Sequence, residues 1–255
     1  MDTLMKVGIL QYAPQWMQPE ENLVSIAEMC SNMSTDTELV FLPEMFNTGY
    51  QLKPATIPVS WQDTTIDYLA NLADKYQITF GGSIPYFDHY KWYNAFLLIN
   101  KNGIAFRYDK SKLFSLAGEA EYYTPGTKRE IFLYGAFKLL PLVCYDLRFA
   151  DLIYNAGIPD VIIYSSNWPV QRIHHWKILL AARAIENQCY VIGINRTGFD
   201  ENGSEYPGVS LVFDFNGSEI LNLGHNAAYG EVILDLNALT TFRRKLPFLK
   251  DRSCC

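Results

Sequence analysis

Short apolar runs that end at a polar or turn-forming residue alternate along this chain with segments whose apolar residues recur at helical spacing. We expect strands over residues 5–12, 38–42, 78–85, 137–144, 161–165, 190–196, 210–215 and 229–234. Helices are expected over residues 20–32, 64–76 and 174–188. Two further strands, 92–100 and 104–108, are joined by Lys101-Asn102-Gly103, which is typical of a hairpin. This alternation predicts an α/β fold of mixed sheets packed under helix layers.

Size and charge restrict the partners of such a fold. The chain has 255 residues, 49% of them hydrophobic, and no linker-like segment, so we interpret residues 1–255 as a single domain. A net charge of -6 offers no basic surface for nucleic acid. Asp2 stands where a signal peptide needs a base, and no stretch approaches the ~20 apolar residues that span a bilayer. We expect a cytoplasmic enzyme that binds neither nucleic acid nor membrane.

Cysteine and histidine usage argues against disulfides and metals. The five cysteines are odd in number and scattered, at positions 30, 144, 189, 254 and 255, which fits neither a disulfide framework nor a zinc site. We expect reduced thiols. Neither His174 nor His175 has a carboxylate or thiol at ligand spacing, and the histidines do not match a cysteine-histidine protease pattern. No metal is therefore expected.

Three segments place a reactive side chain beside an expected buried strand. Glu44 follows the strand at 38–42, Lys110 follows the strand at 104–108, and Cys144 ends the strand at 137–144. Singly, each has an ordinary interpretation: a cap or ion pair, a solvated lysine, or a small core residue. Reactive side chains in α/β proteins nevertheless gather at strand ends, so the three together are candidates for one site.

In order, spacing and local sequence these segments resemble the nitrilase, or carbon-nitrogen hydrolase, superfamily, and most of all its omega-amidase branch. The similarity runs from Val7-Gly8-Ile9 to Gly230-Glu231 and includes the segments 119–126, 166–169, 182–188 and 195–196. The resemblance implies a four-layer α-β-β-α sandwich with two mixed β-sheets. It also implies hydrolysis of an amide C–N bond without a cofactor, and assembly as a homodimer.

The resemblance assigns roles that the chemistry of amide hydrolysis requires. Cys144 is expected to be the nucleophile and Glu44 the general base that takes its proton. Lys110 and the backbone N–H of Tyr145 are expected to stabilise the oxyanion of the tetrahedral intermediate. We also expect the lysine and the carboxylate to remain ionised and to favour the thiolate form of the cysteine.

Two assignments near the lysine stay open at this point. The superfamily keeps a second glutamate near its lysine, for which Glu119 is preferred and Glu121 is the competitor. The family usually has Lys-x-His at the lysine segment, whereas this chain has Lys110-Ser111-Lys112. We assign the catalytic position to Lys110 and interpret Lys112 as solvated or ion-paired.

An omega-amidase acts on short dicarboxylate mono-amides, so the pocket needs a cation for the free carboxylate. Arg148 and Arg172 are the candidates, and for each a structural ion pair is the alternative. Four aromatic residues are expected to wall the pocket: Phe46, Tyr50, Tyr145 and Trp168.

Other functions remain open. One is a different hydrolase of the same superfamily: a carbamoylase, a beta-ureidopropionase-like enzyme, an aliphatic amidase or a nitrilase. Two are not hydrolases: an inactive binding subunit, and a redox sensor in which Cys189 would pair with Cys144. The intact set of Glu44, Lys110 and Cys144 argues against an inactive subunit, because burying such groups together is energetically unfavourable.

Overall fold

The computed structural model describes residues 3–253, so Cys254 and Cys255 lie outside the described residues. It contains two six-stranded mixed sheets. In the first sheet β1 and β3 flank β2 in parallel, while β14, β4 and β5 extend the sheet in antiparallel pairs. The strand order is β14 (Ala228–Asp235), β1 (Leu4–Gln11), β2 (Leu39–Phe41), β3 (Thr79–Asp88), β4 (Lys91–Asn100) and β5 (Gly103–Asp109).

The second sheet has a parallel centre with antiparallel edges. Its strand order is β13 (Glu219–Asn222), β12 (Leu211–Phe213), β9 (Tyr190–Ile194), β8 (Val161–Ser165), β7 (Phe137–Val143) and β6 (Phe132–Tyr134). A separate small hairpin is formed by β10 (Thr197–Phe199) and β11 (Glu205–Pro207).

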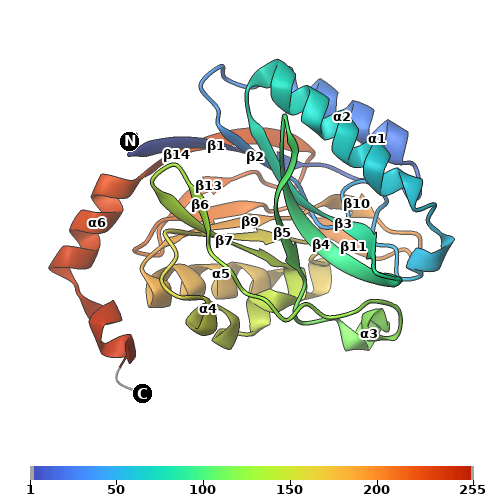
Figure 1. The fold of residues 1–255 in the computed structure, drawn as a ribbon. Coiled ribbons are helices and arrows are strands. Elements are labelled where there is room, and N and C mark those ends of the chain that lie inside the picture. The colour runs from blue at the N-terminus through green and yellow to red at the C-terminus, as the bar shows by residue number, and fades with distance from the viewer. Residues whose placement is uncertain (1–2, 254–255) are drawn as a thin grey trace.

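Helices cover the outer faces of both sheets (Figure 1). The pair α1 (Pro19–Cys30) and α2 (Ser60–Tyr76) lies over the first sheet, and α4 (Asp151–Ala156) and α5 (Ile173–Asn187) lie over the second. The short α3 (Glu119–Tyr122) stands at one end of the sandwich and α6 (Leu236–Lys245) at the other. The expected four-layer α-β-β-α sandwich is confirmed. Short 3₁₀ turns span Pro54–Thr56, Ser115–Ala117, Cys144–Arg148, Val170–Arg172 and Phe248–Ser253.

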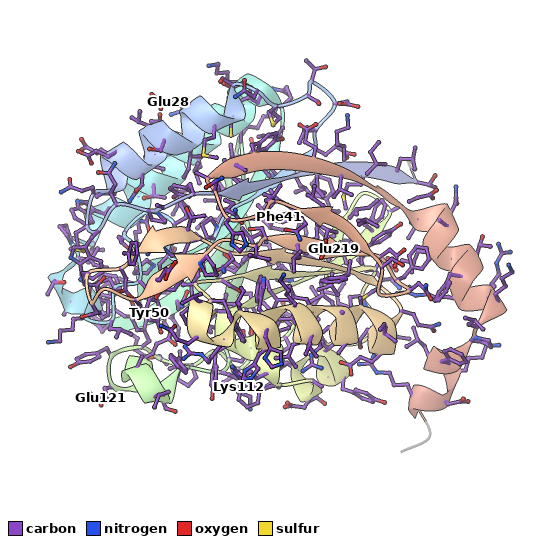
Figure 2. All side chains as sticks on the ribbon, turned by 180° about the vertical axis from the view of Figure 1, so that it is seen from behind. Glu28, Phe41, Tyr50, Lys112, Glu121 and Glu219 are labelled. Carbon is purple, nitrogen blue, oxygen red and sulfur yellow. The ribbon has the colours of Figure 1, made fainter. Side chains whose placement is uncertain are left out.

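Two clusters of buried apolar side chains hold the layers of the sandwich together. The inner cluster joins the facing sides of the two sheets and continues to α5, and it includes Phe41, Phe96 and Trp176. The outer cluster joins the first sheet to α1 and α2. Every residue of β8 and β9 is buried, as expected for parallel strands covered on both faces. Figure 2 shows Phe41 between the layers and Glu28 of α1 pointing outward.

Several short elements were not predicted. The strands β6, β10, β11 and β13 have three or four residues, too few for an apolar period to be recognisable. Helix α6 was also missed, although its ends carry signals: the Asp235 side chain accepts hydrogen bonds from two backbone N–H groups, and three basic residues lie in the last turn. No helix within residues 3–253 combines the length and apolarity needed to cross a bilayer.

Candidate active site

Strand ends of both sheets meet at one place between the layers. Glu44 follows β2, and the backbone N–H of Leu42 continues the ladder by donating to the Gly81 carbonyl on β3 at 2.7 Å. Lys110 follows β5 directly, and its N–H donates to the Asn94 carbonyl on β4 at 2.9 Å. Cys144 follows the last residue of β7 in the opposite sheet. The acid and the lysine therefore come from one sheet and the thiol from the other.

The Lys110 ammonium is enclosed by two carboxylates. Its Nζ lies 2.8 Å from Glu44 Oε1, 2.8 Å from Glu119 Oε2 and 3.0 Å from Glu119 Oε1. The amide Nδ2 of Asn94 donates to Glu44 at 2.8 Å and to Glu119 at 3.0 Å. All four side chains are buried, with at most 1% exposure. Such a cluster is stable only as a unit, because each unpaired charge would be costly at this depth.

Burial and charge shift the pKa values within the cluster. Burial acts to lower the pKa of Lys110, but the carboxylates of Glu119 and Glu44 outweigh it and raise that pKa well above its usual value. Burial raises the pKa of Glu44, Lys110 opposes the rise, and the charge of Glu119 adds to it. The lysine is therefore a permanent cation, and Glu44 is a stronger base than an exposed glutamate.

Cys144 occupies a constrained position at the start of a 3₁₀ turn. Its φ is 42°, in the left-handed region that non-glycine residues rarely adopt, and its Sγ lies 3.7 Å from the Asn167 carbonyl oxygen. Burial raises the pKa of its thiol well above the usual value, Glu44 raises it further, and Lys110 lowers it. The resting thiol is thus protonated, which differs from the expected thiolate because desolvation and Glu44 outweigh the lysine. For this thiol to act as a nucleophile, a base would have to remove its proton.

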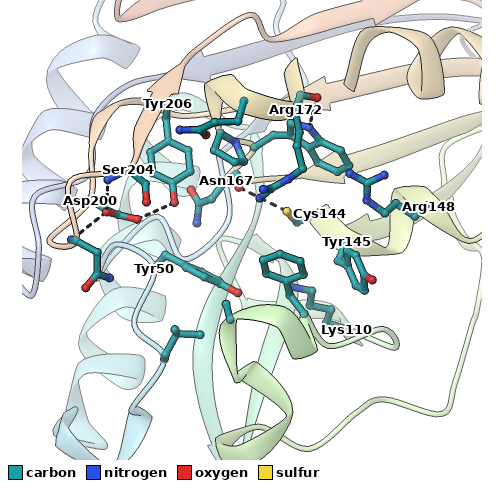
Figure 3. A pocket seen from close by; sticks show the side chains of 17 residues that line it. Tyr50, Lys110, Cys144, Tyr145, Arg148, Asn167, Arg172, Asp200, Ser204 and Tyr206 are labelled. Atoms are coloured by element: carbon teal, nitrogen blue, oxygen red, sulfur yellow. Dashed lines mark hydrogen bonds between the residues drawn. The ribbon is translucent and has the colours of Figure 1, made fainter. Parts of the chain in front are cut away.

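Cys144 and Lys110 line a cavity of about 340 Å³. Among the other lining residues are all but one of the aromatic and arginine side chains assigned from the sequence: Tyr50, Tyr145, Arg148, Trp168 and Arg172. Figure 3 shows Arg148 and Tyr145 at the Cys144 end of the cavity and Asp200, Ser204 and Tyr206 at the far end. The volume suits a small substrate rather than a polymer.

Phe46 is the exception, and its expected place in the pocket wall is corrected. The residue is 1% exposed and packs in the outer cluster between the first sheet and its helices. A Cβ added to Gly82 would lie 2.9 Å from the Phe46 ring, so the ring fills the space that this glycine leaves on β3. The chain turns at Met45, which has a φ of 48°, and this turn directs Glu44 and Phe46 to different surroundings.

The two arginines of the pocket have no carboxylate partner among residues 3–253. The Arg148 guanidinium stacks 4.9 Å from the Trp168 ring centre, and its Nη2 lies 3.3 Å from His175 Nδ1. The Arg172 guanidinium stacks 5.5 Å from the ring centre of Phe114. Aromatic faces hold both cations without neutralising them, which leaves their charge available to an anion.

The structure distinguishes Glu119 from Glu121 and Lys110 from Lys112. Glu119 is fully buried against Lys110 and also accepts a hydrogen bond from the Phe114 N–H at 2.6 Å, whereas Glu121 is exposed. Lys112 lies in a neighbouring cavity, with its Nζ 4.8 Å from the ring centre of Phe149. Glu119 is therefore the glutamate at the lysine, and Lys110, rather than Lys112, belongs to the cluster.

Three polar groups of the site had no role assigned from the sequence. Asn94 interrupts the apolar run of β4, and a polar residue within a buried run is the signal that could have marked it. Asn167 follows β8, and its N–H donates to Glu44 Oε2 at 3.1 Å. Asp200 forms the far wall, accepting from the N–H groups of Asn202 and Ser204 and from the Tyr206 hydroxyl at 2.9 Å. Its turn-rich surroundings gave no pattern.

The geometry rules out a disulfide between Cys144 and Cys189. Cys144 follows Val143, which aligns with Ile194 through β8, while Cys189 precedes Tyr190 at the opposite end of the parallel strands. At ~3.3 Å per residue the two cysteines are separated by roughly 15–20 Å, far beyond the ~7 Å that a disulfide can bridge. Cys189 is also fully buried. A redox sensor that pairs Cys144 with Cys189 is therefore excluded. No group of His, Cys, Asp and Glu side chains among the described residues could hold a metal ion.

Known proteins share both the sequence and the fold. The carbon-nitrogen hydrolase family model matches residues 6–244. The omega-amidase YafV of Yersinia enterocolitica is 37% identical over 98% of this chain and 97% of its own length. A 2-oxoglutaramate amidase of Bacillus subtilis is 30% identical over 96% of each chain. A CN-hydrolase superfamily protein from Xanthomonas campestris superposes with a TM-score of 0.92 and 27% identity, covering 98% of this chain and 97% of that one. The chain belongs to the carbon-nitrogen hydrolase family, and it is an amide-acting hydrolase of the nitrilase superfamily.

Proposed function

We propose that this protein is an omega-amidase that releases ammonia from short dicarboxylate mono-amides such as 2-oxoglutaramate and 2-oxosuccinamate. The observation that carries the proposal is a buried Glu44–Lys110–Glu119 cluster beside a thiol, in a small pocket with two unpaired arginines. The names of the relatives from Yersinia and Bacillus support the same substrate class.

In the acylation step, Glu44 takes the thiol proton as the sulfur of Cys144 bonds to the amide carbon. The charge of Glu44 raises the pKa of this thiol, which supports a base close to the sulfur. The carbonyl oxygen becomes an oxyanion near the Lys110 ammonium and the Tyr145 N–H. As the C–N bond breaks, the proton on Glu44 passes to the nitrogen, ammonia leaves and a thioester remains.

In the deacylation step, Glu44 removes a proton from water, whose oxygen bonds to the thioester carbon. The C–S bond then breaks, the proton returns to sulfur and the dicarboxylic acid leaves. Glu119 holds Lys110 and Asn94 holds Glu44, since each accepts from or donates to its partner directly. Fixed charges of this kind need no rearrangement during the reaction, which is the main source of their effect.

The two arginines account for selection of a carboxylate. Neither arginine pairs with a carboxylate among residues 3–253, their guanidinium groups stack on aromatic rings, and both line the cavity that contains Cys144. Replacing either Arg148 or Arg172 by glutamine is expected to raise KM for succinamate, by ~10–100-fold for the arginine that binds the carboxylate, because a charge-assisted hydrogen bond is worth about 1.5–3 kcal/mol. Initial rates of ammonia release measure this.

Propionamide is the control substrate because it lacks the free carboxylate. The arginine variants are expected to change its kcat/KM by less than about threefold. Equal losses on both substrates would contradict carboxylate binding and indicate that the arginines only support the pocket wall.

The pH dependence tests Glu44 as the base. Burial raises its pKa above the usual 4.5, so kcat/KM is expected to fall as the pH drops through that raised value, earlier than for an exposed glutamate. Since the charge of Glu119 contributes to the rise, Glu119→Gln should move this acid limb to lower pH. A pH–rate profile from pH 4 to 9 measures both. A rate that keeps climbing above pH 8 would instead mean that hydroxide, not Glu44, removes the thiol proton.

A substrate panel distinguishes this function from the alternatives. Ammonia release is measured with 2-oxoglutaramate, succinamate, glutamine, a simple nitrile and N-carbamoyl-beta-alanine. Turnover that is fastest on the two mono-amides supports an omega-amidase. Preference for the carbamoyl compound, the nitrile or a neutral amide would move the protein to another branch of the superfamily, and no turnover of any of them would favour a binding subunit.

We propose that the protein works as a homodimer in the cytoplasm, with each chain acting as one hydrolase domain. Exposed apolar side chains lie on α4 and α5, among them Tyr154, Ile178 and Ile185, with more than half of each surface accessible. Cys30, Cys144 and Cys189 are free thiols, which suits a reducing compartment. Light scattering on the purified protein would detect the dimer.

A further inference from the structure

A buried carboxylate with no catalytic assignment lies directly beneath the nucleophile. Asp146 is fully buried and stands two residues after Cys144 in the same 3₁₀ turn. No lysine, arginine or histidine among residues 3–253 forms an ion pair with it. A buried carboxylate stays charged only where several hydrogen-bond donors stabilise it. The donors to Asp146 therefore show which parts of the site it fixes in place.

Three donors converge on Asp146, and they come from both sides of the active site. On the nucleophile side, the N–H of Val143 donates to Oδ2 at 3.0 Å. On the lysine side, the Tyr108 hydroxyl donates to Oδ2 at 2.8 Å and the Lys112 N–H donates to Oδ1 at 2.8 Å. Tyr108 and Lys112 stand two residues before and two residues after Lys110, so the carboxylate holds both ends of the lysine segment.

The lysine segment and the turn that begins at Cys144 also touch through two ring contacts, Phe114 with Tyr145 and Lys112 with Phe149. They come from different sheets, and Cys144 has an unfavourable left-handed φ that its surroundings must impose. The hydrogen bond from the Val143 N–H ties Asp146 to the residue before Cys144. The hydrogen bonds from Tyr108 and Lys112 attach the same turn to the lysine segment. A displacement of ~1 Å between reacting groups can lower a rate by ~10²-fold.

We propose that Asp146 is a positioning residue that sets the distance between the Lys110 ammonium and the Cys144 sulfur. It touches neither the substrate nor the reacting atoms and acts through the backbone N–H groups of Val143 and Lys112 and through the Tyr108 hydroxyl. The inference deepens the proposed cysteine mechanism and rests on it. Its test therefore includes a reaction of Cys144 that needs no amide substrate.

The test variant is Asp146→Asn, which keeps the size of the side chain but puts an NH₂ group where an acceptor is needed. Asp160→Asn is the matched control. Asp160 is also a buried carboxylate, and it accepts from the Lys138 N–H at 3.0 Å at the opposite end of β7, where it also pairs with Arg243 at 2.7 Å. Both substitutions remove a buried carboxylate that accepts a hydrogen bond from a backbone N–H, but only Asp146 lies beside the active site.

Two quantities are measured per folded molecule: kcat and KM for succinamate, and the second-order rate of Cys144 alkylation by iodoacetamide, with the labelled peptide identified by mass spectrometry. Asp146→Asn is expected to lower kcat by ~10–100-fold with KM within about threefold of wild type. Alkylation should change by at least about threefold, because the thiol moves relative to Lys110 and Glu44. Asp160→Asn should match wild type in both.

Tyr108→Phe provides a second variant in case Asp146→Asn does not fold. It removes one of the three donors and is expected to lower kcat less, by ~3–10-fold. Equal kcat in the folded Asp146 and Asp160 variants, or an unchanged kcat in Tyr108→Phe, would overturn the proposal. If wild type hydrolyses none of the mono-amides, the proposed substrate fails, but the alkylation rates still decide whether Asp146 positions the thiol.

Discussion

Replacing Cys144 by alanine is expected to lower ammonia release from succinamate by at least ~10⁴-fold, because no other group can form the thioester. The fold should survive, since the substitution removes a single sulfur at a half-buried position that lines the pocket. The measurement is kcat at equal folded concentration, with circular dichroism to establish folding. Mass spectrometry after mixing wild type with substrate should detect an acyl adduct on the peptide that contains residue 144, and the variant should show none.

Cys189→Ala is the matched control. Cys189 is also a reduced thiol and is fully buried, but it lies at the far end of the parallel strands. Its loss is expected to leave kcat within about twofold of wild type and to lower stability modestly, by about 1–2 kcal/mol, for the small cavity it creates. If Cys144→Ala retained activity comparable to that of the control, the covalent mechanism would be wrong.

Replacing Lys110 by methionine is expected to have the largest effect on stability. The substitution leaves Glu44 and Glu119 buried beside each other without the cation that now contacts both. Breaking a buried charge cluster in this way typically lowers the free energy of unfolding by about 3–5 kcal/mol. Urea denaturation followed by circular dichroism measures the loss. Activity should disappear as well, because the oxyanion loses its cation.

The pH dependence of this variant follows from the sign of the shifts. Burial and the charge of Glu119 raise the pKa of Glu44, and removing Lys110 takes away the charge that opposes this rise, so the folded state of the variant binds more protons than the unfolded state as the pH falls. The variant is therefore expected to gain stability as the pH falls from 8 toward 5, relative to wild type. A loss that is independent of pH would indicate a packing defect rather than unpaired charge.

Lys6→Met is the control for removing a lysine. Lys6 pairs with Asp36 at 2.6 Å, but the Asp36 side chain is 69% exposed. Exposed pairs contribute about 0–1 kcal/mol, so this variant should unfold at nearly the wild-type urea concentration. Similar losses in the Lys6 and Lys110 variants would contradict the importance of the buried cluster.

Much of the fold was predictable because the apolar period of each long strand and helix matches the face that the sandwich buries. The long strands and the helices α1, α2 and α5 follow apolar periods that burial in a four-layer sandwich requires. The prediction failed for the short strands β6, β10, β11 and β13, where register against a neighbouring strand, not the period, decides the structure. It also failed for α6, whose capping signals were present but not used.

The sequence by itself determined the family, the order of the main strands and the positions of Glu44, Lys110 and Cys144 at strand ends, because these depend on local pattern and on motif order. The choice of Glu119 over Glu121, the inward turn of Glu44 away from Phe46 and the unpaired state of Arg148 and Arg172 were decided only by the tertiary structure. The protonated resting state of the Cys144 thiol belongs with them. The physical reason is common to all: distances, burial and local charge between segments far apart in the chain exist only after two sheets have packed face to face.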